Sequence, residues 1–530
     1  MTPKIFSNAT VITLDPERPR ATGLRIDGGR ITHVFDGEIP LDLEGERIDL
    51  GGAVVLPGLV DAHFHLRGLG QSARQLDFRG TRSVDEITRT VRNAVAVAQA
   101  GTWIRGRGWD QNDWADKKFP THAALDAVAP NHPVWLSRID GHAVWLNARA
   151  MRLTGITAET KDPPGGEILR DASGRATGIF VDNAIDLVDG LLPKPTPVEL
   201  REDLLAAQAL CVRVGLTGVH DMGTTPAELD QLRALAREGR LKLRVTVYLD
   251  GQVDDLASLL TSPPERQGLL TVIGVKMYAD GALGSRGAAL LAPYEDRADT
   301  SGLMLTSPET LTAKARAVHD AGYQLAIHAI GDRGVRVALD AIAVAQREGR
   351  DRRHRVEHVQ VVAPEDFERF ASLGVIASLQ PTHATSDMPW AEARLGPERV
   401  RGAYAWRRLL DAHAALAFGS DAPVEEENPW LGIYAAVTRQ DARGEPKGGW
   451  MPQERLTVLE TISAFTRGAA FAAGQSNLGV IRPGAVADLT VVDRDPEAVP
   501  PSELLTMHTL RTMVGGREVF AGGGAASPQP

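Results

Sequence analysis

The sequence predicts an α/β protein: a (β/α)8 TIM-type barrel with a small β-sandwich domain formed from both chain ends and a large insertion after strand one. Three observations lead to this fold class. Helical segments alternate with short apolar strands from about residue 198, both chain ends contain only short β segments between turns, and the interval after the first barrel strand is several times longer than a single crossover. A length of 530 residues is compatible with one barrel that carries an insertion.

The two chain ends are predicted to pair into one small β-domain. Their β segments, separated by turn signals such as Asp27-Gly28-Gly29, lie at residues 4–14, 23–35, 46–56, 487–493 and 511–520. Neither end has enough strands to bury a core by itself. The two ends are therefore expected to form one domain beside the barrel.

The barrel is predicted from a repeated helix–strand unit. Residues 197–214 have helical spacing with a proline at the start, and a short apolar strand follows Gly215. Further helices are expected at 226–237, 308–320 and 364–373. The eight expected strands, apolar on both faces as in a buried parallel sheet, lie at 54–65, 216–220, 243–249, 272–278, 324–328, 354–358, 375–379 and 414–418.

The interval between the first two strands is predicted to be an insertion over about residues 67–196, on the face where barrels place their active sites. It contains a hairpin pattern at 166–182. The predicted division is a β-domain from 1–56 and 477–520, a barrel over 57–476 and a flexible tail at 521–530.

Composition excludes several classes of protein. The formal net charge is −10 and basic residues are interspersed with acidic ones, so neither nucleic acid nor a membrane surface is an expected partner. The single cysteine, Cys211, cannot form an intrachain disulfide, and neither a signal peptide nor a membrane-length apolar segment is recognisable. We expect a cytoplasmic protein, and leave open whether it is a homodimer.

Titratable residues occur at the ends of five predicted strands. His63 and His65 lie two apart and so share one face of the first strand. Lys276 stands within an apolar strand, where an unpaired ammonium is costly. His328, His358 and Asp421 follow other strands, and each alone could equally be a core or cap residue. Because barrel strands end on one face, together they predict a metal site.

These residues and the sequence around them resemble the amidohydrolase superfamily, in particular its YtcJ-like branch, which includes N-substituted formamide deformylases. The matching motifs are Leu56-Pro-Gly-Leu-Val-Asp-Ala-His63, Lys276-Met-Tyr-Ala-Asp-Gly-Ala-Leu-Gly-Ser285, His328-Ala-Ile-Gly-Asp332, Arg355-Val-Glu-His358, Gln380-Pro-Thr-His383 and Gly419-Ser-Asp-Ala-Pro423.

The resemblance implies a binuclear metal-dependent hydrolase of a non-peptide amide C–N bond. It implies that His63, His65 and Asp421 hold one ion, that His328 and His358 hold the other, and that carbamylated Lys276 bridges them. Zn²⁺ is expected first, with Mn²⁺, Fe²⁺ and Co²⁺ as alternatives. Asp421 is expected to transfer the proton of a metal-bridging water to the leaving nitrogen.

Other residues are candidates for contacts with a small amide substrate. His220 and His383 lie at strand ends, and Asp280 and Arg286 lie in a glycine-rich loop after the Lys276 strand. In the insertion, Arg107-Gly-Trp109-Asp110 and Asp140-Gly-His142 also fit the resemblance. Hydrogen bonding or capping within the fold is an equally good interpretation of His220, His383, Asp280 and Arg286.

Two other functions compete with amide hydrolysis. A mononuclear deaminase of the same superfamily typically has a glutamate three residues after the strand-five histidine, but here that position is Gly331. A catalytically silent barrel scaffold would have lost metal ligands, and this chain keeps all six. Both alternatives are therefore disfavoured.

Tryptophan placement predicts the substrate class. None of the nine tryptophans lies between residues 146 and 389; five are in the insertion, and Trp390, Trp406, Trp430 and Trp450 follow the last two strands. Such rings favour a substrate with an aromatic or bulky apolar substituent on an N-formyl or N-acyl group. The alternative is that the insertion uses its tryptophans for its own core.

Overall fold

The computed structural model describes residues 2–138, 143–163, 166–182, 184–189, 192, 194–253, 255–349 and 351–522. The chain divides into two compact units, residues 1–67 with 207–530 and residues 68–206. Most of the predicted tail lies outside the described residues, and β25 (Arg517–Ala521) is the last strand before it.

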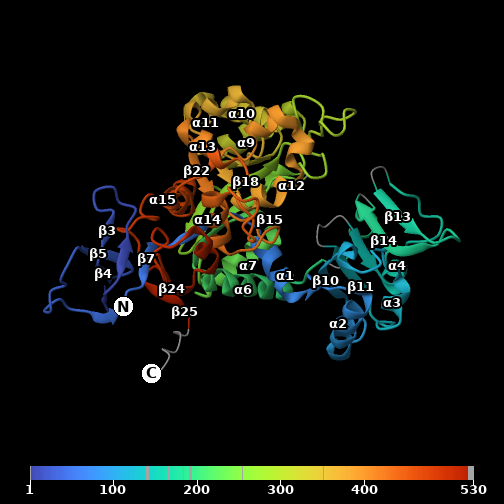
Figure 1. The fold of residues 1–530 in the computed structure, drawn as a ribbon, viewed down its shortest axis with the longest axis horizontal. Coiled ribbons are helices and arrows are strands. Elements are labelled where there is room, and N and C mark those ends of the chain that lie inside the picture. The colour runs from blue at the N-terminus through green and yellow to red at the C-terminus, as the bar shows by residue number, and fades with distance from the viewer. Residues whose placement is uncertain are drawn as a thin grey trace. The chain divides into compact units, whose positions relative to one another are not determined.

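The larger unit contains a nearly closed barrel of eight parallel strands (Figure 1). In sheet order these are β8 (Leu59–Phe64), β15 (Leu216–Thr224), β16 (Arg244–Asp250), β18 (Leu270–Tyr278), β19 (Gln324–Ala329), β20 (Arg355–His358), β21 (Ile376–Leu379) and β22 (Ala415–Phe418). A short strand, β17 (Glu265–Gln267), pairs antiparallel with β18. The predicted barrel is confirmed.

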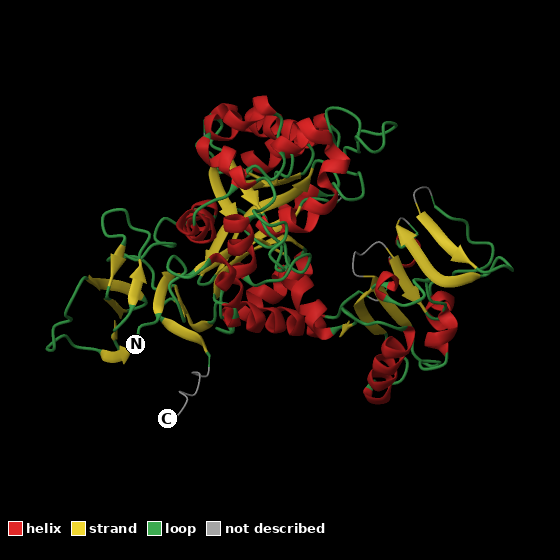
Figure 2. Cartoon of the chain, in the orientation of Figure 1, coloured by secondary structure: helices red, strands yellow, loops and turns green. Residues whose placement is uncertain are grey.

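Helices follow or precede these strands and surround the sheet (Figure 2). They are α6 (Pro197–Arg213), α7 (Pro226–Arg237), α9 (Pro308–Asp320), α10 (Asp332–Ala345), α11 (Phe367–Ser372), α12 (Pro381–Arg399), α13 (Trp406–Asp411), α14 (Pro429–Thr438), α15 (Val458–Ser463) and α16 (Ala469–Ala472). The start of α7 shows why the sequence marks it clearly. Thr225 and Glu228 form a capping box and Pro226 occupies the first turn, so the free backbone N–H groups there are satisfied.

The first and last strands meet through backbone hydrogen bonds just beyond their ends. The amide of Asp421 donates to the carbonyl of His63 at 2.8 Å, and the amide of His65 donates to the carbonyl of Ala422 at 2.9 Å. A Cβ atom on Gly419 would lie 2.4 Å from Oδ1 of Asp61, so only glycine permits this approach. The junction fixes Asp421 beside the two histidines of β8.

The predicted first strand, 54–65, is wrong in one respect, because the structure divides it in two. β7 (Val54–Pro57) pairs with β2 (Thr10–Ile12) and β23 (Leu489–Val492) in the small domain, and only β8 belongs to the barrel. Gly58 separates them and donates its amide to the carbonyl of Asp488 at 2.8 Å. An uninterrupted apolar run conceals this change of partner.

The chain ends form the small β-sandwich. One sheet has the order β5 (Arg30–Phe35), β4 (Gly23–Asp27), β1 (Lys4–Ser7) and β6 (Glu46–Asp49); the other has the order β25, β24 (Thr509–Val514), β23, β7, β2 and β3 (Arg20–Ala21). A shared core includes Phe6, Leu24, Leu489 and Met513. The pairing of β7 with β23 joins the two ends, as the sequence predicts.

The smaller unit contains its own six-stranded sheet. Its order is β13 (Gly166–Arg170), β14 (Ala176–Asp182), β12 (Ala143–Leu146), β11 (Val134–Arg138), β10 (Ile104–Trp109) and β9 (Leu76–Asp77). β13 and β14 form the hairpin expected at 166–182. Helices α2 (Val84–Val97), α3 (His122–Asp126) and α4 (Ala148–Leu153) accompany the sheet. Two apolar clusters give this unit a core of its own.

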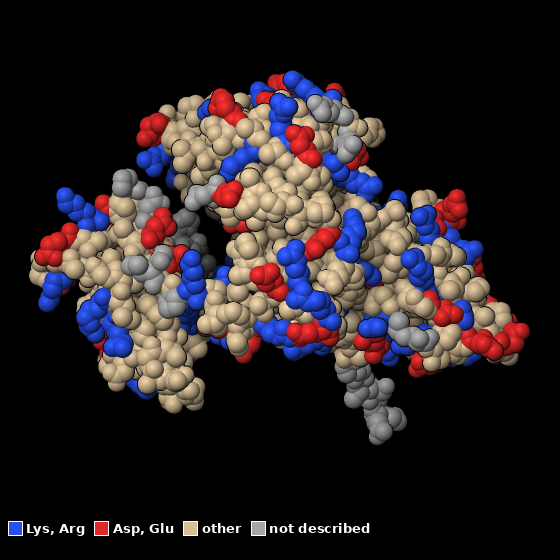
Figure 3. All heavy atoms as spheres, turned by 180° about the vertical axis from the view of Figure 1, so that it is seen from behind, with Lys and Arg blue, Asp and Glu red and all other residues tan. Residues whose placement is uncertain are grey.

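The surface is mixed in charge. On the face shown in Figure 3, basic and acidic side chains are interspersed over the surface. Among the described residues, no helix is both long and apolar enough to cross a bilayer.

Candidate metal centre

All six predicted ligands lie at the carboxyl ends of barrel strands. His63 is in β8 and His65 directly follows it, Lys276 is in β18, and Asp421 follows β22. The other two are His328 in β19 and His358, the last residue of β20. Parallel strands bring their carboxyl ends to one edge, so the topology places these side chains together.

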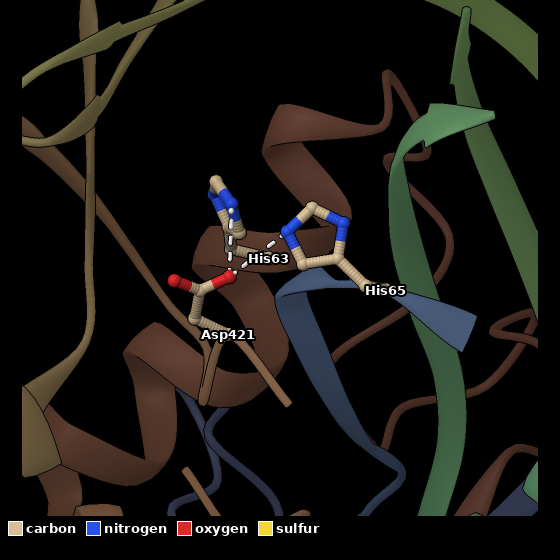
Figure 4. Close-up of side chains that lie close together, drawn as sticks. All are labelled: His63, His65 and Asp421. Atoms are coloured by element: carbon tan, nitrogen blue, oxygen red, sulfur yellow. Dashed lines mark ion pairs between the residues drawn. The ribbon is translucent and has the colours of Figure 1, made fainter. Parts of the chain in front are cut away.

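Close contacts connect the six residues into one cluster. Oδ1 of Asp421 lies 3.0 Å from Nε2 of His65 and 3.5 Å from Nε2 of His63 (Figure 4). Nζ of Lys276 lies 3.2 Å from Nε2 of His63. The ring of His358 lies 4.6 Å from that of His63 and 4.5 Å from that of His328.

Hydrogen bonds orient three of the imidazoles in the same way. Nδ1 of His63 lies 2.6 Å from Oε2 of Glu357, Nδ1 of His65 lies 3.0 Å from the carbonyl of Met222, and Nδ1 of His358 lies 2.9 Å from Oε1 of Gln380. An Nδ1 that faces an acceptor oxygen carries the proton, so the Nε2 lone pair points into the cluster. Metal-binding histidines are oriented in this way.

Glu357 is a functional neighbour that sequence reasoning did not single out. It is fully buried, contacts His63, and accepts two hydrogen bonds from the guanidinium of Arg355. Arg355 is also fully buried and donates to the carbonyl of Ala62 and the hydroxyl of Ser378. Two charged residues two apart in an apolar strand share one face, and that pattern could have revealed the pair.

Burial keeps the imidazoles of His63, His328 and His358 neutral. It lowers the pKa of His63 to about 4 and that of His328 to about 3, and it holds the pKa of His358 well below its ordinary value. Burial also lowers the pKa of Lys276 to about 8. Neutral imidazoles can bind a metal ion, and a partly deprotonated lysine is the form that reacts with CO₂.

The cluster retains buried polar atoms that have no hydrogen-bond partner among the described residues. They are Oδ1 of Asp421, Nε2 of His383 and Nε2 of Gln380. Within 4.8 Å of one another lie ligand atoms of His63, His65 and Asp421, and likewise those of His358, His383 and Asp421. Imidazole nitrogens and a carboxylate suit Zn²⁺ and similar divalent ions, so the residues present fit a metal centre.

The second of these groups contains His383 where the sequence analysis expected His328. Nε2 of His328 lies 3.5 Å from the carbonyl of Gly281 and 3.7 Å from Oδ1 of Asp280. Nε2 of His383 lies 3.7 Å from Oδ2 of Asp421. His328 as a ligand stays a prediction, and His383 is placed at the centre as well.

Three further candidates have contacts within the fold. His220 is buried, and Nη1 of Arg355 donates to its Nδ1 at 2.9 Å. The carboxylate of Asp280 accepts backbone N–H groups of Ala289, Ile330 and Gly331, which ties together the loops after β18 and β19. Arg286 forms a two-pronged ion pair with Asp296. Each arrangement accounts for its residue without a substrate.

The candidates in the insertion are described within that unit alone. Trp109 is fully buried in the insertion core, and its indole N–H donates to the carbonyl of Leu136 at 2.9 Å. Asp110 accepts a hydrogen bond from Arg138 at 3.0 Å. Asp140 and His142 lie outside the described residues. Substrate contact by Trp109 and Asp110 stays a prediction, and the packing favours the interpretation of Trp109 as a core residue.

The tryptophans after the last two strands differ in exposure. Trp406 and Trp430 are buried, and Trp450 packs against the guanidinium of Arg439. Trp390, in α12, is half-buried. A Cβ atom added to Gly284 would contact the Trp390 ring at 3.4 Å, so this ring packs on the loop after β18. Of the four, Trp390 and Trp450 are the two that are not buried.

Comparison with known proteins gives one family. A model described as "Amidohydrolase family" matches residues 46–520. Protein LONG AFTER FAR-RED 3 of Arabidopsis thaliana is 34% identical and covers 97% of this chain and 91% of its own. The amidohydrolase named YtcJ of Bacillus subtilis (strain 168) is 35% identical, with 90% and 91% covered. The N-substituted formamide deformylase of Arthrobacter pascens is 29% identical, with 96% of each covered.

Solved structures agree with this match. An uncharacterized metal-dependent hydrolase of Pyrococcus horikoshii OT3 is 30% identical, with a TM-score of 0.82, and covers 94% of this chain and 99% of its own. Another, of Pyrococcus furiosus, is 31% identical with a TM-score of 0.80, and covers 93% and 100%.

Proposed function

The chain belongs to the amidohydrolase family and is a metal-dependent hydrolase of carbon–nitrogen bonds other than peptide bonds; from this premise we propose that it hydrolyses an N-formyl or N-acyl amide at a binuclear centre. The observation that carries the proposal is the single cluster of His63, His65, Lys276 and Asp421 with two further histidines at the carboxyl end of the barrel. The resemblance to the formamide deformylase supports the substrate class.

The ligands divide into two sets around Asp421. His63 and His65 would hold one ion with Asp421, and His358 would hold the other with His328 or His383. Lys276, buried beside His63, would bridge them as a carbamate. Carbamylation replaces a buried ammonium with a carboxylate that two cations neutralise, which removes the cost of the isolated charge. Zn²⁺ is the ion that this donor set favours first.

Divalent ions held there would polarise the scissile carbonyl and acidify a bound water. Asp421 supplies the proton transfer. Its carboxylate lies beside His63 and His65, with Oδ1 at 3.5 Å and 3.0 Å from their Nε2 atoms. It takes the proton of the attacking water and returns it to the leaving nitrogen, so amide and water become an amine and a carboxylic acid.

Position 331 argues against the deaminase alternative. A Cβ atom added to Gly331 would lie 2.0 Å from the backbone carbonyl oxygen of Ala289, so no side chain fits there. The shuttle that a mononuclear deaminase uses at this place has no room. A catalytically silent scaffold is disfavoured because the cluster keeps buried polar atoms whose hydrogen-bonding capacity no described residue satisfies.

An apolar substituent on the substrate is supported by the surface after β18 and β22. Leu303 and Leu305 are 61% and 51% exposed, Val424 is 65% exposed three residues after Asp421, and Trp390 is half-buried. Backbone hydrogen bonds join Leu303 to Gly287 and Leu305 to Ala279, which keeps both leucines near the end of β18. These side chains offer contact area to an aryl or alkyl group.

A cytoplasmic location stays an expectation, and the single cysteine, Cys211, is buried and free. The proposed reaction requires neither this location nor a homodimer.

Metal analysis combined with amide assays tests the function. Protein prepared without chelator is expected to contain two divalent ions per chain and to release formate or a short acid from N-benzylformamide and N-acylanilines. A kcat/KM panel that includes charged dipeptides and ring amides of nucleobases measures the substituent preference. A clear preference for either of the latter would refute the apolar-substituent proposal. Protein prepared without chelator that contains almost no metal and hydrolyses no amide would refute amide hydrolysis.

A further inference from the structure

A cavity lies at the opposite end of the barrel from the metal centre. Its volume is about 710 Å³, and it is lined by the start of β22, by the segment from α15 to α16, and by loops of the small β-domain. It touches Ala415 and Leu416, whereas Asp421 follows the other end of the same strand. This volume is in the range of cavities that hold drug-sized ligands.

The floor of this cavity is apolar. Leu416, Ala464 and Ala470 are buried there, and Phe471, a large apolar side chain that is 41% exposed, forms part of its wall. An exposed aromatic ring beside buried aliphatic groups offers a surface on which an apolar ligand can pack.

Three arginines line the same cavity without a carboxylate partner. Arg353 donates to the carbonyl of Phe471 at 2.9 Å and stacks on its ring, and Arg467 donates to the carbonyl of Leu14 at 3.1 Å. Among the described residues neither these two nor Arg482 forms an ion pair with an acidic side chain. Each guanidinium retains donors that are not used.

The acidic residues of the cavity do not balance this charge. Glu460 is already paired with Arg407 at 2.5 Å and caps α15. Asp15 is the one other acidic residue in the lining, and its carboxylate accepts the amide of Glu17. Three arginines against Asp15 leave excess positive charge in a chain whose net charge is −10. Such a site attracts an anion.

An adjoining cavity extends the positive surface. It holds about 210 Å³, shares Arg353 with the larger cavity, and adds Arg266 and Arg352. Arg266 donates to the carbonyl of Ala473 at 2.9 Å, and within the described part of the chain it too has no acidic partner. By contrast, arginines on the barrel surface nearby, such as Arg233 and Arg369, are paired with carboxylates.

We propose that the cavity lined by Arg353, Arg467 and Arg482 binds an amphipathic carboxylate, with its apolar chain on the Phe471 side and its carboxylate on the arginines. Guanidinium groups bind carboxylates through paired N–H donors, and the apolar floor supplies the remaining affinity. The site is separate from the metal centre, and this inference does not depend on the proposed catalytic function.

Calorimetric titration of the full chain with decanoate tests the proposal. Decanoate is expected to bind saturably at one site per chain, and acetate, which lacks the chain, and decanol, which lacks the charge, are each expected to bind at least about 10-fold more weakly. If acetate binds as tightly as decanoate, the cavity recognises only the negative charge. If decanol binds as tightly as decanoate, the arginines do not contribute to recognition. Either result would overturn the proposal.

Variants locate the binding. Arg467→Gln and Arg353→Gln are expected to weaken decanoate by about 10-fold each, because each removes a charge-assisted hydrogen bond. Arg401→Gln is the matched control, since this exposed arginine is paired with Glu398 and lies outside the cavity. Decanoate binding should persist in Lys276→Ala. If binding is lost there but kept in the arginine variants, the ligand occupies the metal centre and the proposal is wrong.

The same titration distinguishes a second copy of the chain as the occupant. Repeated at tenfold higher protein concentration, it should give the same affinity and one site per chain. If the affinity falls as the chain self-associates, and if Arg467→Gln abolishes that self-association, the cavity is an interface between copies instead.

Discussion

The two ends of the barrel bury histidines for different purposes. At the carboxyl end, Asp421 and His383 retain buried atoms that no described residue pairs by a hydrogen bond. At the amino end, Nε2 of His354 lies 2.8 Å from Nδ1 of His319, and its Nδ1 accepts the amide of Leu325 at 2.9 Å. Both ring nitrogens of His354 are therefore satisfied inside the protein.

This difference indicates which buried polar groups serve a ligand. A satisfied pair such as His319 and His354 stabilises the fold and needs nothing further. A cluster that leaves acceptors unpaired is costly in the protein alone, so it is expected where an ion or substrate completes it. Variants at the two ends should therefore separate loss of metal and activity from loss of stability.

The largest effect is expected from Lys276→Ala at the carboxyl end. Removing this buried side chain removes the proposed bridge between the ions, so metal content should fall and amide hydrolysis should drop to background. Metal analysis and turnover measure both. Bicarbonate with a short carboxylic acid should restore part of the activity, whereas a fully metallated and fully active variant would contradict the bridge.

Asp421→Asn should cost roughly 10²-fold or more in turnover, the scale of a lost general base. The amide keeps the size of the side chain, so the fold and much of the metal should remain. Turnover is compared at equal metal content. A rate within about threefold of the parent protein would remove Asp421 from proton transfer.

Glu357→Gln tests the residue that orients the proposed metal ligand His63. It replaces the carboxylate that orients His63 and pairs with Arg355 by a neutral amide, whose oxygen is a weaker acceptor. Loss of such a supporting group typically weakens metal affinity 10–100-fold, and a competition titration with a chelator measures it. Glu368→Gln is the control, since it exchanges a carboxylate for an amide in α11, away from the cluster. An unchanged metal affinity in Glu357→Gln would show that His63 does not need a charged orienting partner.

The smallest effect on function is expected at the amino end. His354→Leu should lower stability by about 1–3 kcal/mol, because the amide of Leu325 loses its acceptor in the interior. Thermal unfolding measures the loss, while metal content and kcat should not change. A loss of metal in this variant would show that His354 also supports the metal centre, so the two ends of the barrel would not differ in function.

The pH dependence of the same variant sharpens the test. Burial lowers the pKa of His354 to about 3 from an ordinary value of 6.5. A base whose folded pKa is depressed contributes stability above pH 6.5 that is lost as the pH falls toward 3. The parent protein should therefore lose stability more steeply below pH 6.5 than His354→Leu does. Parallel curves would show that His354 is not held neutral.

The barrel could be predicted because the sequence signals for its helices and strands lie within those segments themselves. Helix starts such as Thr225-Pro226 and apolar strands such as 272–278 appear directly in the sequence. The position of Lys276 was informative for the same reason, since a single charge interrupts an apolar strand. The change of sheet at Gly58 was missed because it depends on pairing with β23, more than 400 residues away.

The site was predicted in part. The residues that resemblance named are brought together, and His383, expected as a substrate contact, lies at the same centre. The roles of Glu357 and Gln380 in orienting imidazoles emerge only from the fold. Tryptophan placement could not distinguish a pocket from a core, because both need large rings. The buried Trp109 and the half-buried Trp390 show that the same residue type serves different environments.

The hydrogen bonds between the His63–His65 segment and the Asp421–Ala422 segment also have a consequence for synthesis. More than 350 residues separate the two segments, and ribosomes add about 5–20 residues per second. The metal centre therefore cannot be assembled until roughly 20 to 70 s after His65 is translated. During this interval the nascent chain carries histidines that have no partner aspartate, so metal loading is expected only once the chain is nearly complete.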